Sequence, residues 1–196
     1  MVPATPHYLK VKKLTHTYGT APLFSAVSFD LSPGCILQVT GKNGSGKSTL
    51  LQLLAGIKLY QTGSISWLQD VTRSYVGHKN AIKTELSPIE NLALYQPDAS
   101  IRIQALELMG LEKSHCRRPC YMLSAGQQRK VALSRLALIE AKVWLLDEPF
   151  TALDDAARLG LSKYLEKHAK AGGSAIVATH DRLDISGSIL HELVMS

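Results

Sequence analysis

The sequence predicts an α/β fold with a parallel central sheet, and three apolar runs carry this prediction. Residues 35–40 form an apolar run that enters a glycine-rich turn, and the apolar segment 49–55 follows that turn. Two further runs, residues 143–146 and 174–178, each end in polar residues. Short apolar runs bounded by polar residues are typical of buried strands in a parallel sheet, and the segment after the turn is long enough to start a helix.

The turn at residues 41–48, the phosphate loop, has the pattern G-x-x-x-x-G-K-[ST] between a predicted strand and a predicted helix. Its glycines let successive backbone N–H groups point at phosphate oxygens, and the helix N-terminus adds partial positive charge. Lys47 can reach the β and γ phosphates, and the Ser48 hydroxyl can ligate Mg²⁺. A flexible loop that holds a lysine by chance is the weaker alternative, so we expect a nucleoside triphosphate here. The expected nucleotide-binding residues are Gly41, Lys42, Asn43, Gly44, Ser45, Gly46, Lys47, Ser48 and Thr49.

The two carboxylates after residues 143–146 are candidate metal-binding and catalytic groups. At the end of a central strand beside the phosphate loop, Asp147 would hold Mg²⁺ through water. Glu148 would face the γ-phosphate, where a carboxylate can orient or deprotonate the attacking water. An ordinary strand end with exposed acids is the alternative interpretation, and the neighbouring phosphate loop disfavours it.

Residues 123–129, Leu-Ser-Ala-Gly-Gln-Gln-Arg, open a predicted helix that runs to about residue 140. With this motif the chain resembles the ABC ATPases, and the resemblance covers residues 9–194. The motif Leu-Ser-x-Gly-Gln at residues 123–127, called the signature below, separates that family from other phosphate-loop ATPases. The resemblance implies a P-loop NTPase fold, an ABC cassette with a mixed central sheet, an antiparallel β subdomain and a helical insertion. It also implies that two cassettes pair head to tail, with the signature of one covering the γ-phosphate of the other. Ser124, Gly126 and Gln127 would then contact that nucleotide, although Ser124 also fits a helix N-cap.

Further positions follow the order of this family. Tyr18 precedes Gly41 by 23 residues, where the family places an aromatic ring that stacks on adenine; a core or edge residue is the alternative. Residues 152–154 resemble the loop that contacts the partner cassette. His180 resembles the switch histidine that hydrogen-bonds the γ-phosphate, with a polar strand end as the alternative. The resemblance therefore makes Lys47, Glu148 and His180 the expected catalytic residues.

One position, His78, departs from the general pattern, which usually has a Gln there that touches Mg²⁺ and the membrane partner. Residues 75–84 and 146–154, together with the signature, are similar to one branch of the family, the haem-exporter ATPases of bacterial cytochrome c maturation. In that branch Gly-His is usually followed by Gly-Ile-Lys-Thr, and here Ala81 replaces the Gly and Lys79 replaces a Gln. The resemblance implies an ATPase at the cytoplasmic side of the bacterial inner membrane that powers haem export. We expect His78 to join Ser48 and Asp147 near the metal; the alternative is that His78 packs in its loop and that Ser48 and Asp147 alone hold the metal.

Other classes that carry this signature fit the chain less well. DNA-repair and chromosome ATPases insert a long coiled coil before the signature, whereas Ser48 and Ser124 are only 76 residues apart. Translation-associated ABC factors carry two cassettes, and kinases and small GTPases lack the signature. ATPases for lipoprotein release or small-molecule transport remain alternatives, and they would carry Gln at position 78. We expect integral membrane transporter subunits as partners, a homodimer of cassettes with ATP bound, and no nucleic acid.

The remaining patterns predict the other elements in chain order. Strands are expected at residues 8–14, 26–31 and 64–68, the first two of them antiparallel. Residues 79–140 are expected to be a helical subdomain, in which Ser87, Pro88 and Glu90 form a capping box that begins one helix. Further helices are expected at residues 101–109 and 154–171. We expect one ABC ATP-binding domain over residues 1–196.

Composition agrees with a single domain that has no membrane anchor. The chain is 45% hydrophobic and 19% charged, which suits one domain with a sizeable core. Residues 1–6 lack the basic and apolar regions of a signal peptide, and the sequence has no 18-residue apolar stretch. The basic residues behind the net charge of +6 are dispersed and identify no partner. The odd number of cysteines, three, predicts reduced thiols, and the His-Cys pattern at residues 115–120 is a weak metal signal.

Overall fold

The larger of the two main sheets holds the three apolar runs of the sequence. The computed structural model describes residues 7–19, 21–181, 183–185, 187 and 189–195. Its five-stranded sheet has the order β10 (Leu190–Met195), β5 (Ile36–Gly41), β9 (Ser174–Ala178), β8 (Val143–Asp147) and β7 (Arg73–Val76). All four strand pairs are parallel. Because parallel strands end at the same edge, the segments after β5, β7, β8 and β9 meet there, where α/β proteins bind their ligands.

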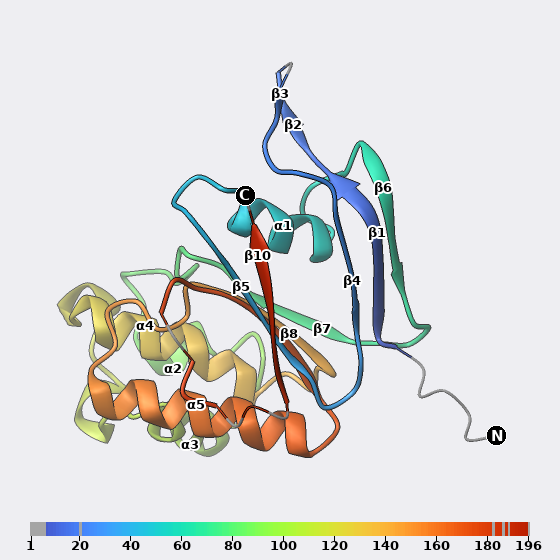
Figure 1. Ribbon diagram of the computed structural model, residues 1–196. Helices are drawn as coiled ribbons and strands as arrows, with labels where there is room; N and C mark the ends of the chain where they lie inside the picture. Colours follow the sequence, from blue (N-terminus) through green and yellow to red (C-terminus); the bar gives the residue numbers. More distant parts are fainter. Residues whose placement is uncertain (1–6, 20, 182, 186, 188, 196) are drawn as a thin grey trace.

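Helices cover both faces of this sheet (Figure 1). α1 (Lys47–Leu54) lies on one face and packs through Leu50, Leu51 and Leu54 into a core shared with the antiparallel strands. α5 (Asp155–Lys170) lies on the other face, where Leu161 and Leu165 pack against β8 and β9. Coverage on both faces explains why β8 and β9 are buried along their whole length.

The antiparallel strands form a separate sheet. Its order is β4 (Val27–Leu31), β1 (Leu9–Thr15) and β6 (Thr62–Trp67), and β2 (Thr17–Tyr18) pairs with β3 (Ala21–Pro22) in a short hairpin. In β1, Leu9, Val11 and Leu14 face the core, while Lys10 and Lys12 are exposed. The α/β fold class is confirmed, with one refinement: among the described residues, strands of the two senses lie in different sheets.

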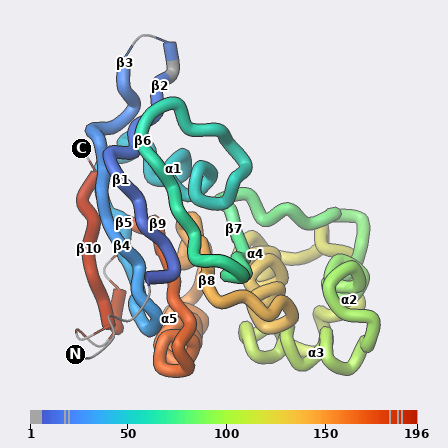
Figure 2. Tube along the Cα trace, turned by 90° about the vertical axis from the view of Figure 1, so that its right-hand side faces the viewer, coloured from blue at the N-terminus to red at the C-terminus, as the bar shows by residue number. Residues whose placement is uncertain are grey.

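The segment between β7 and β8 is helical and lies to one side, apart from the antiparallel sheet (Figure 2). It contains α2 (Pro88–Asn91), α3 (Ala99–Leu108) and α4 (Ala125–Ser134), with short 3-10 turns η1 (Lys113–His115), η2 (Cys120–Met122) and η3 (Arg135–Ala137). These elements share their own buried cluster, which includes Leu92, Leu106, Leu111, Cys120 and Val131. The capping box of Ser87 and Glu90 at the start of α2 is confirmed.

The helix after the signature ends earlier than its pattern predicts. α4 ends at Ser134 and continues as η3, whereas the sequence indicates a helix to about residue 140. The Ser134 hydroxyl donates to the Lys130 carbonyl at 2.8 Å, and Arg135 Nε donates to the Ala132 carbonyl at 2.8 Å. A side chain that bonds back to the preceding turn bends a helix, which accounts for the tighter 3-10 geometry here.

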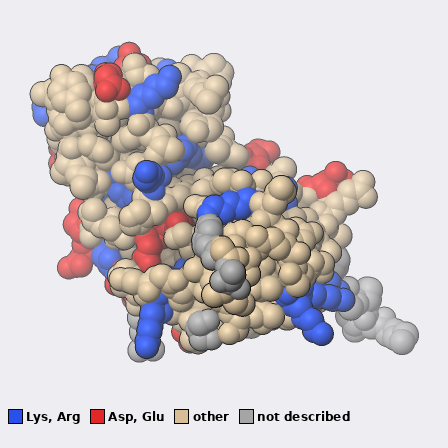
Figure 3. Space-filling view, turned by 90° about the horizontal axis from the view of Figure 1, so that it is seen from above, with Lys and Arg blue, Asp and Glu red and all other residues tan. Residues whose placement is uncertain are grey.

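The next two observations concern membrane-spanning helices and the distribution of surface charge. Among the described residues, no helix has both the length and the apolar character that crossing a membrane requires. On the face that Figure 3 shows, Lys and Arg are scattered among acidic and other residues. The net charge therefore does not gather into one basic patch on that face.

Candidate functional site

The phosphate loop connects β5 to α1 at the carboxyl edge of the parallel sheet. Gly41 and Gly46 have φ angles of 144° and 91°, which L side chains rarely adopt. A Cβ on Gly46 would lie 2.6 Å from Cδ1 of Phe24, and one on Gly41 would lie 2.5 Å from the Met195 carbonyl oxygen. Both positions therefore need glycine for conformation and for space.

Lys47 lies under the loop that precedes it. Its side chain is buried at 7% exposure, and its ammonium donates to the carbonyls of Gly41 at 2.8 Å and Lys42 at 3.2 Å. Carbonyl oxygens stabilise a buried cation, and here they hold the ammonium inside the curl of the loop. The structure thus places the Lys47 ammonium, predicted from the sequence to bind phosphate, inside the loop.

Ser48 and Asp147 meet across the sheet edge. The Ser48 hydroxyl donates to Oδ1 of Asp147 at 2.9 Å, although 99 residues separate them. Asp147 ends β8 and is 1% exposed. Burial and the negative charge of Asp147 raise the pKa of the neighbouring Tyr75. A hydroxyl and a carboxylate side by side form the oxygen-rich kind of site that Mg²⁺ prefers.

Glu148 and His180 form a second pair at the same edge. Nδ1 of His180 lies 3.1 Å from Oε1 of Glu148, and the Glu148 backbone N–H donates to the Ala178 carbonyl at 2.8 Å. Glu148 has a φ angle of 48°, a sparsely populated conformation for a residue with a side chain. Its other oxygen, Oε2, is buried and has no hydrogen-bond partner among the described residues. The strain and the unpartnered oxygen make Glu148 a candidate functional carboxylate.

One pocket of about 460 Å³ joins most of these groups. His78 enters it from the loop after β7, as an exposed side chain. The structure thus places His78 beside the phosphate loop, and its predicted contact with a metal stays a prediction. The pocket is lined by Leu23, Asn43, Gly44, Gly46, Lys47, Ser48, Thr49, His78 and Glu148.

Arg129 is a central residue of the site that the sequence did not single out. It is 3% exposed and extends from α4 to the ends of β8 and β7. Its guanidinium donates to the carbonyls of Asp147 at 2.8 Å, Glu148 at 3.0 Å and Gly77 at 2.8 Å. Burial lowers its pKa to about 10, so the group stays protonated at neutral pH. Arg129 thereby fixes the backbone beside Asp147, Glu148 and His78.

The signature lines a different pocket. Ser124 caps α4: its hydroxyl accepts from the Gln127 N–H at 3.2 Å, and Oε1 of Gln127 accepts from the Ser124 N–H at 2.9 Å. A Cβ on Gly126 would overlap the Ala152 carbonyl oxygen, so Gly126 permits close contact with the 152–154 loop. The residues of the pocket include Glu112, His115, Ser124, Ala125, Gly126, Gln127, Lys130, Ala152 and Asp154.

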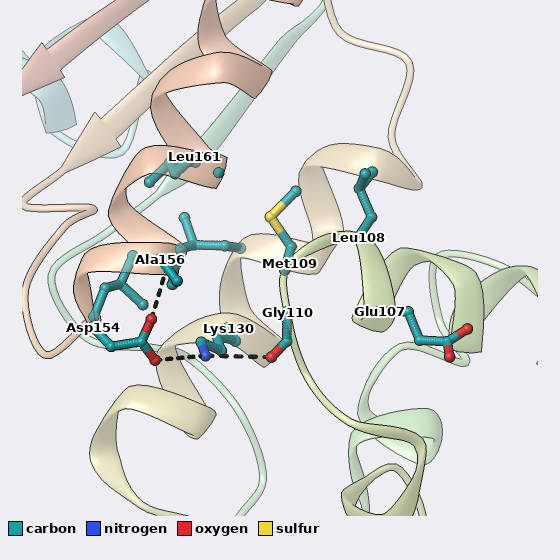
Figure 4. A pocket seen from close by; sticks show the side chains of 12 residues that line it. Glu107, Leu108, Met109, Gly110, Lys130, Asp154, Ala156 and Leu161 are labelled. Atoms are coloured by element: carbon teal, nitrogen blue, oxygen red, sulfur yellow. Dashed lines mark hydrogen bonds and ion pairs between the residues drawn. The ribbon is translucent and has the colours of Figure 1, made fainter. Parts of the chain in front are cut away.

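A neighbouring pocket shows how the signature helix is anchored (Figure 4). Lys130 donates to Oδ2 of Asp154 at 3.0 Å and to the Gly110 carbonyl at 3.3 Å. Asp154 also caps α5, because its Oδ1 accepts from the Ala157 N–H at 2.8 Å. The signature and the phosphate loop thus belong to separate pockets of the chain, and the structure does not bring them together.

Two further sets of residues were singled out from the sequence, Tyr18 and the cysteines. The side chain of Tyr18 lies outside the described part of the chain, so its stacking on adenine stays a prediction. Cys116 and Cys120 are buried in the helical core, and burial raises the pKa of both thiols. The Asn91 amide donates to Sγ of Cys120 at 3.4 Å. These thiols pack as small core residues.

Comparison with known sequences places these features in one family. The ABC transporter family model matches residues 24–151. The cytochrome c biogenesis ATP-binding export protein CcmA of Nitrosococcus oceani is 41% identical over 196 residues, covering 91% of this chain and 88% of its own. The proteins of the same name from Escherichia coli K12 and Cupriavidus pinatubonensis are each 38% identical; they cover 96% and 93% of this chain, and 96% and 87% of their own lengths.

Solved structures agree on the fold. A dimeric bacterial ABC transporter cassette superposes with a TM-score of 0.83 at 22% identity, covering 95% of this chain and 94% of its own. A dimeric cassette in a post-hydrolysis state bound to ADP and Pi gives a TM-score of 0.79 at 24% identity, covering 88% of each chain. The ABC cassette fold predicted from the sequence is confirmed.

Proposed function

The chain belongs to the ABC transporter family, and we propose that it is the ATP-hydrolysing subunit that powers an export step in bacterial c-type cytochrome biogenesis. Relatives that carry this role in their name match more than nine-tenths of the chain. The observation that carries the chemistry is the cluster at the carboxyl edge of the sheet, where Lys47, Ser48 and Glu148 line one pocket and Ser48 bonds to Asp147. Haem is the cargo we infer, from the branch resemblance around His78.

ATP fits the phosphate-loop pocket. Lys47 would pair its ammonium with β- and γ-phosphate oxygens in place of the loop carbonyls that it now contacts. The hydroxyl of Ser45, within the loop, is buried and has no hydrogen-bond partner among the described residues, so a phosphate oxygen would satisfy it. The N-terminus of α1 adds backbone donors. Tyr18 is our candidate for stacking on adenine.

Mg²⁺ is the cofactor that we propose with ATP. The Ser48 hydroxyl and the Asp147 carboxylate, 2.9 Å apart, are oxygen donors of the kind that Mg²⁺ uses beside phosphates. When bound, the ion would supply positive charge against the β- and γ-phosphate oxygens. His78 lies in the same pocket as Ser48 and would contact the ion or its water.

Glu148 and His180 are the residues that we propose for hydrolysis. The unpartnered Oε2 of Glu148 would orient the attacking water and accept its proton. Oε1 of Glu148 accepts from Nδ1 of His180 and so holds the ring beside the pocket, where it would sense the γ-phosphate. Arg129 would keep the Glu148 backbone in the strained conformation that aims this carboxylate.

The complete site would be shared by two chains. Ser124, Gly126 and Gln127 lie at the N-terminus of α4, in a pocket separate from the phosphate loop. A helix N-terminus attracts anions, so the signature of one cassette would cover the γ-phosphate bound to its partner. We propose that two such chains form an ATP-dependent homodimer. In each chain, residues 1–196 would form one ABC domain with a helical subdomain at residues 79–140. Integral membrane subunits would hold the assembly at the cytoplasmic side of the inner membrane.

Mixing two inactive variants tests the shared site. Lys47→Ala removes the charge that binds the phosphates, and Ser124→Arg places a bulky cation on the signature. Each variant alone should hydrolyse ATP at under about 1% of the wild-type rate, on the scale of losing a group that stabilises the transition state. A mixture should recover hydrolysis, because mixed dimers combine an intact phosphate loop from one chain with an intact signature from the other.

The control for this mixture is each variant mixed with itself at the same total concentration. Recovery that rises and saturates as the second chain is titrated in supports a site built from two chains. A mixture as inactive as its components contradicts the proposal.

A further inference from the structure

We propose that His115 is a positioning residue for the signature: its ring holds the side-chain amide of Gln127 and, through it, the Ser124 end of α4. His115 belongs to η1, which precedes the signature, and lines the same pocket as Ser124. This inference rests on the proposed function, in which the signature acts on nucleotide bound to the partner chain.

The donors and acceptors of this contact have one consistent arrangement. Oε1 of Gln127 accepts from the Ser124 backbone N–H at 2.9 Å, which fixes the orientation of the amide. The amide nitrogen, Nε2, then faces Nε2 of His115 at 3.3 Å and can only donate. Nε2 of His115 must therefore accept, and the ring proton lies on Nδ1.

The other side of the ring supports this tautomer. Nδ1 of His115 lies 3.3 Å from the Ser114 hydroxyl and 3.8 Å from Oε2 of Glu112. The Ser114 hydroxyl in turn donates to Oε2 of Glu112 at 3.2 Å. An acceptor next to Nδ1 favours a proton on that nitrogen and a lone pair on Nε2. A chain of polar contacts thus runs from Glu112 through His115 to Gln127.

This contact matters because it acts on the Gln127 side chain, whereas the Gln128 amide holds only the start of the signature, through the Leu123 carbonyl at 3.1 Å. Ser124 is exposed, and its capping bonds with Gln127 are local to the first turn of α4. On the other side, Lys130 ties α4 to Asp154 and Gly110 (Figure 4). The His115 ring is shielded, with 21% of its side chain exposed. It supplies a partly buried acceptor that restricts the rotamers of Gln127.

The mixing experiment locates the effect of His115 in one chain. In the mixture, the Lys47→Ala chain supplies the working signature, and the Ser124→Arg chain supplies the working phosphate loop. His115→Leu in the Lys47→Ala chain should lower ATP hydrolysis by about 10-fold, because a displaced group costs rate without loss of binding. The same change in the Ser124→Arg chain should leave the rate of the mixture within about two-fold.

Two further variants separate positioning from folding. His115→Gln keeps an acceptor at the reach of Nε2, and in the Lys47→Ala chain it should restore at least about half of the rate that His115→Leu removes. Lys113→Leu, on the same short turn but pointing to Glu107, is the matched control and should leave hydrolysis unchanged. ATP binding by the single chains should not change with either His115 variant.

Equal losses from His115→Leu in either chain would overturn the proposal, because they would mean that the change disturbs folding rather than the signature. No loss from either chain would overturn it as well, as would a His115→Gln variant no better than His115→Leu. A parent mixture that fails to recover hydrolysis contradicts the shared site itself, and with it any role of His115 through that site. That outcome is visible before any His115 variant is added.

Discussion

The phosphate-loop pocket and the signature pocket are held by the fold in opposite ways. Around the phosphate loop, Lys47, Asp147 and Arg129 are buried. Asp147 and Arg129 bond to partners from other segments of the chain, and Lys47 bonds to carbonyls of its own loop. In the signature, Ser124 is exposed and bonds within its own turn, with His115 beside Gln127. One half is built into the edge of a parallel sheet, and the other is presented at the end of a helix.

This difference is the reason why we propose that a second chain completes the site. The sheet edge supplies a cation, a hydroxyl and a carboxylate, from Lys47, Ser48 and Glu148, which line one pocket. Asp147 accepts from the Ser48 hydroxyl. The helix end carries the first backbone N–H groups of α4 and lines a different pocket. In a closed site each half would complete the other, since a helix N-terminus attracts an anion and a bound phosphate is stabilised by further donors. Changes in the first half should therefore alter chemistry, and changes in the second should alter assembly.

The largest effect is expected from Glu148→Gln in the sheet-edge half. The amide cannot accept the proton of the attacking water, so ATP hydrolysis should fall at least ~100-fold. ATP affinity should persist, because Lys47 and the loop backbone are unchanged. Steady-state phosphate release and equilibrium ATP binding measure the two quantities. Glu140→Gln, a matched change at an exposed position, is the control. Undiminished hydrolysis in the Glu148→Gln variant would remove Glu148 from the mechanism.

Arg129 connects the two halves, and its removal should cost stability as well as activity. Arg129→Met leaves buried carbonyls at Asp147, Glu148 and Gly77 without a donor, and one such loss costs about 1–3 kcal/mol. We expect the free energy of unfolding to fall by about 2 kcal/mol, measured by urea denaturation. Arg129→Lys keeps the positive charge but lacks the forked donors of the guanidinium, and its free energy of unfolding should fall by less than that of Arg129→Met. Equal stability of all three proteins would show that the guanidinium contacts contribute little.

Variants of His78 test the loop after β7, which contributes this side chain to the phosphate-loop pocket. His78→Gln should leave the ATPase rate of the isolated chain within a few-fold, because Gln also offers a neutral acceptor to the metal or its water. It should impair cytochrome c maturation in cells, since its reach toward the membrane subunits differs. His78→Ala should impair both. Normal maturation with both variants would leave His78 without a role in coupling.

The smallest effect concerns His168, which lies outside both halves. Its ring stacks on Trp144 with centroids 3.7 Å apart, and burial lowers its pKa below 6.5. The unfolded chain therefore binds more protons at this residue, so stability should fall as the pH drops through about 6.5. His168→Phe keeps the stack and should reduce the loss of Tm between pH 7.5 and pH 5.5. An identical loss in both proteins would exclude His168 as the cause.

The fold and the phosphate-loop half of the site were predictable because short patterns in the sequence indicate their strands and the residues that follow each strand. The phosphate loop, the acidic pair after residues 143–146 and the polar end of residues 174–178 each follow an apolar run. Parallel strands bring the ends of such runs together, and the structure places Ser48 against Asp147, and Glu148 against His180. The roles of these residues remain predictions, because no nucleotide contact tests them.

Arg129 and His115 could not be predicted in the same way. The partners of Arg129 are backbone carbonyls from separate segments. Every residue has a backbone carbonyl, so the sequence does not indicate which of them Arg129 contacts. The contact of His115 with Gln127 depends on how a short 3-10 turn packs beside α4. The early end of α4 likewise depends on the bonds that the Ser134 and Arg135 side chains make back to the preceding turn. Such features arise from tertiary packing rather than from the periodicity of the sequence.

The size of the Glu148→Gln chain with ATP and Mg²⁺ tests the central claim most directly, that one site is completed by two chains. Because this variant should bind ATP without consuming it, we predict a stable dimer in size-exclusion chromatography with light scattering, and a monomer without nucleotide. Adding Ser124→Arg to the same chain should return it to a monomer that still binds ATP. A Glu148→Gln chain that stays monomeric with ATP bound, or a dimer that persists after Ser124→Arg, would contradict the account.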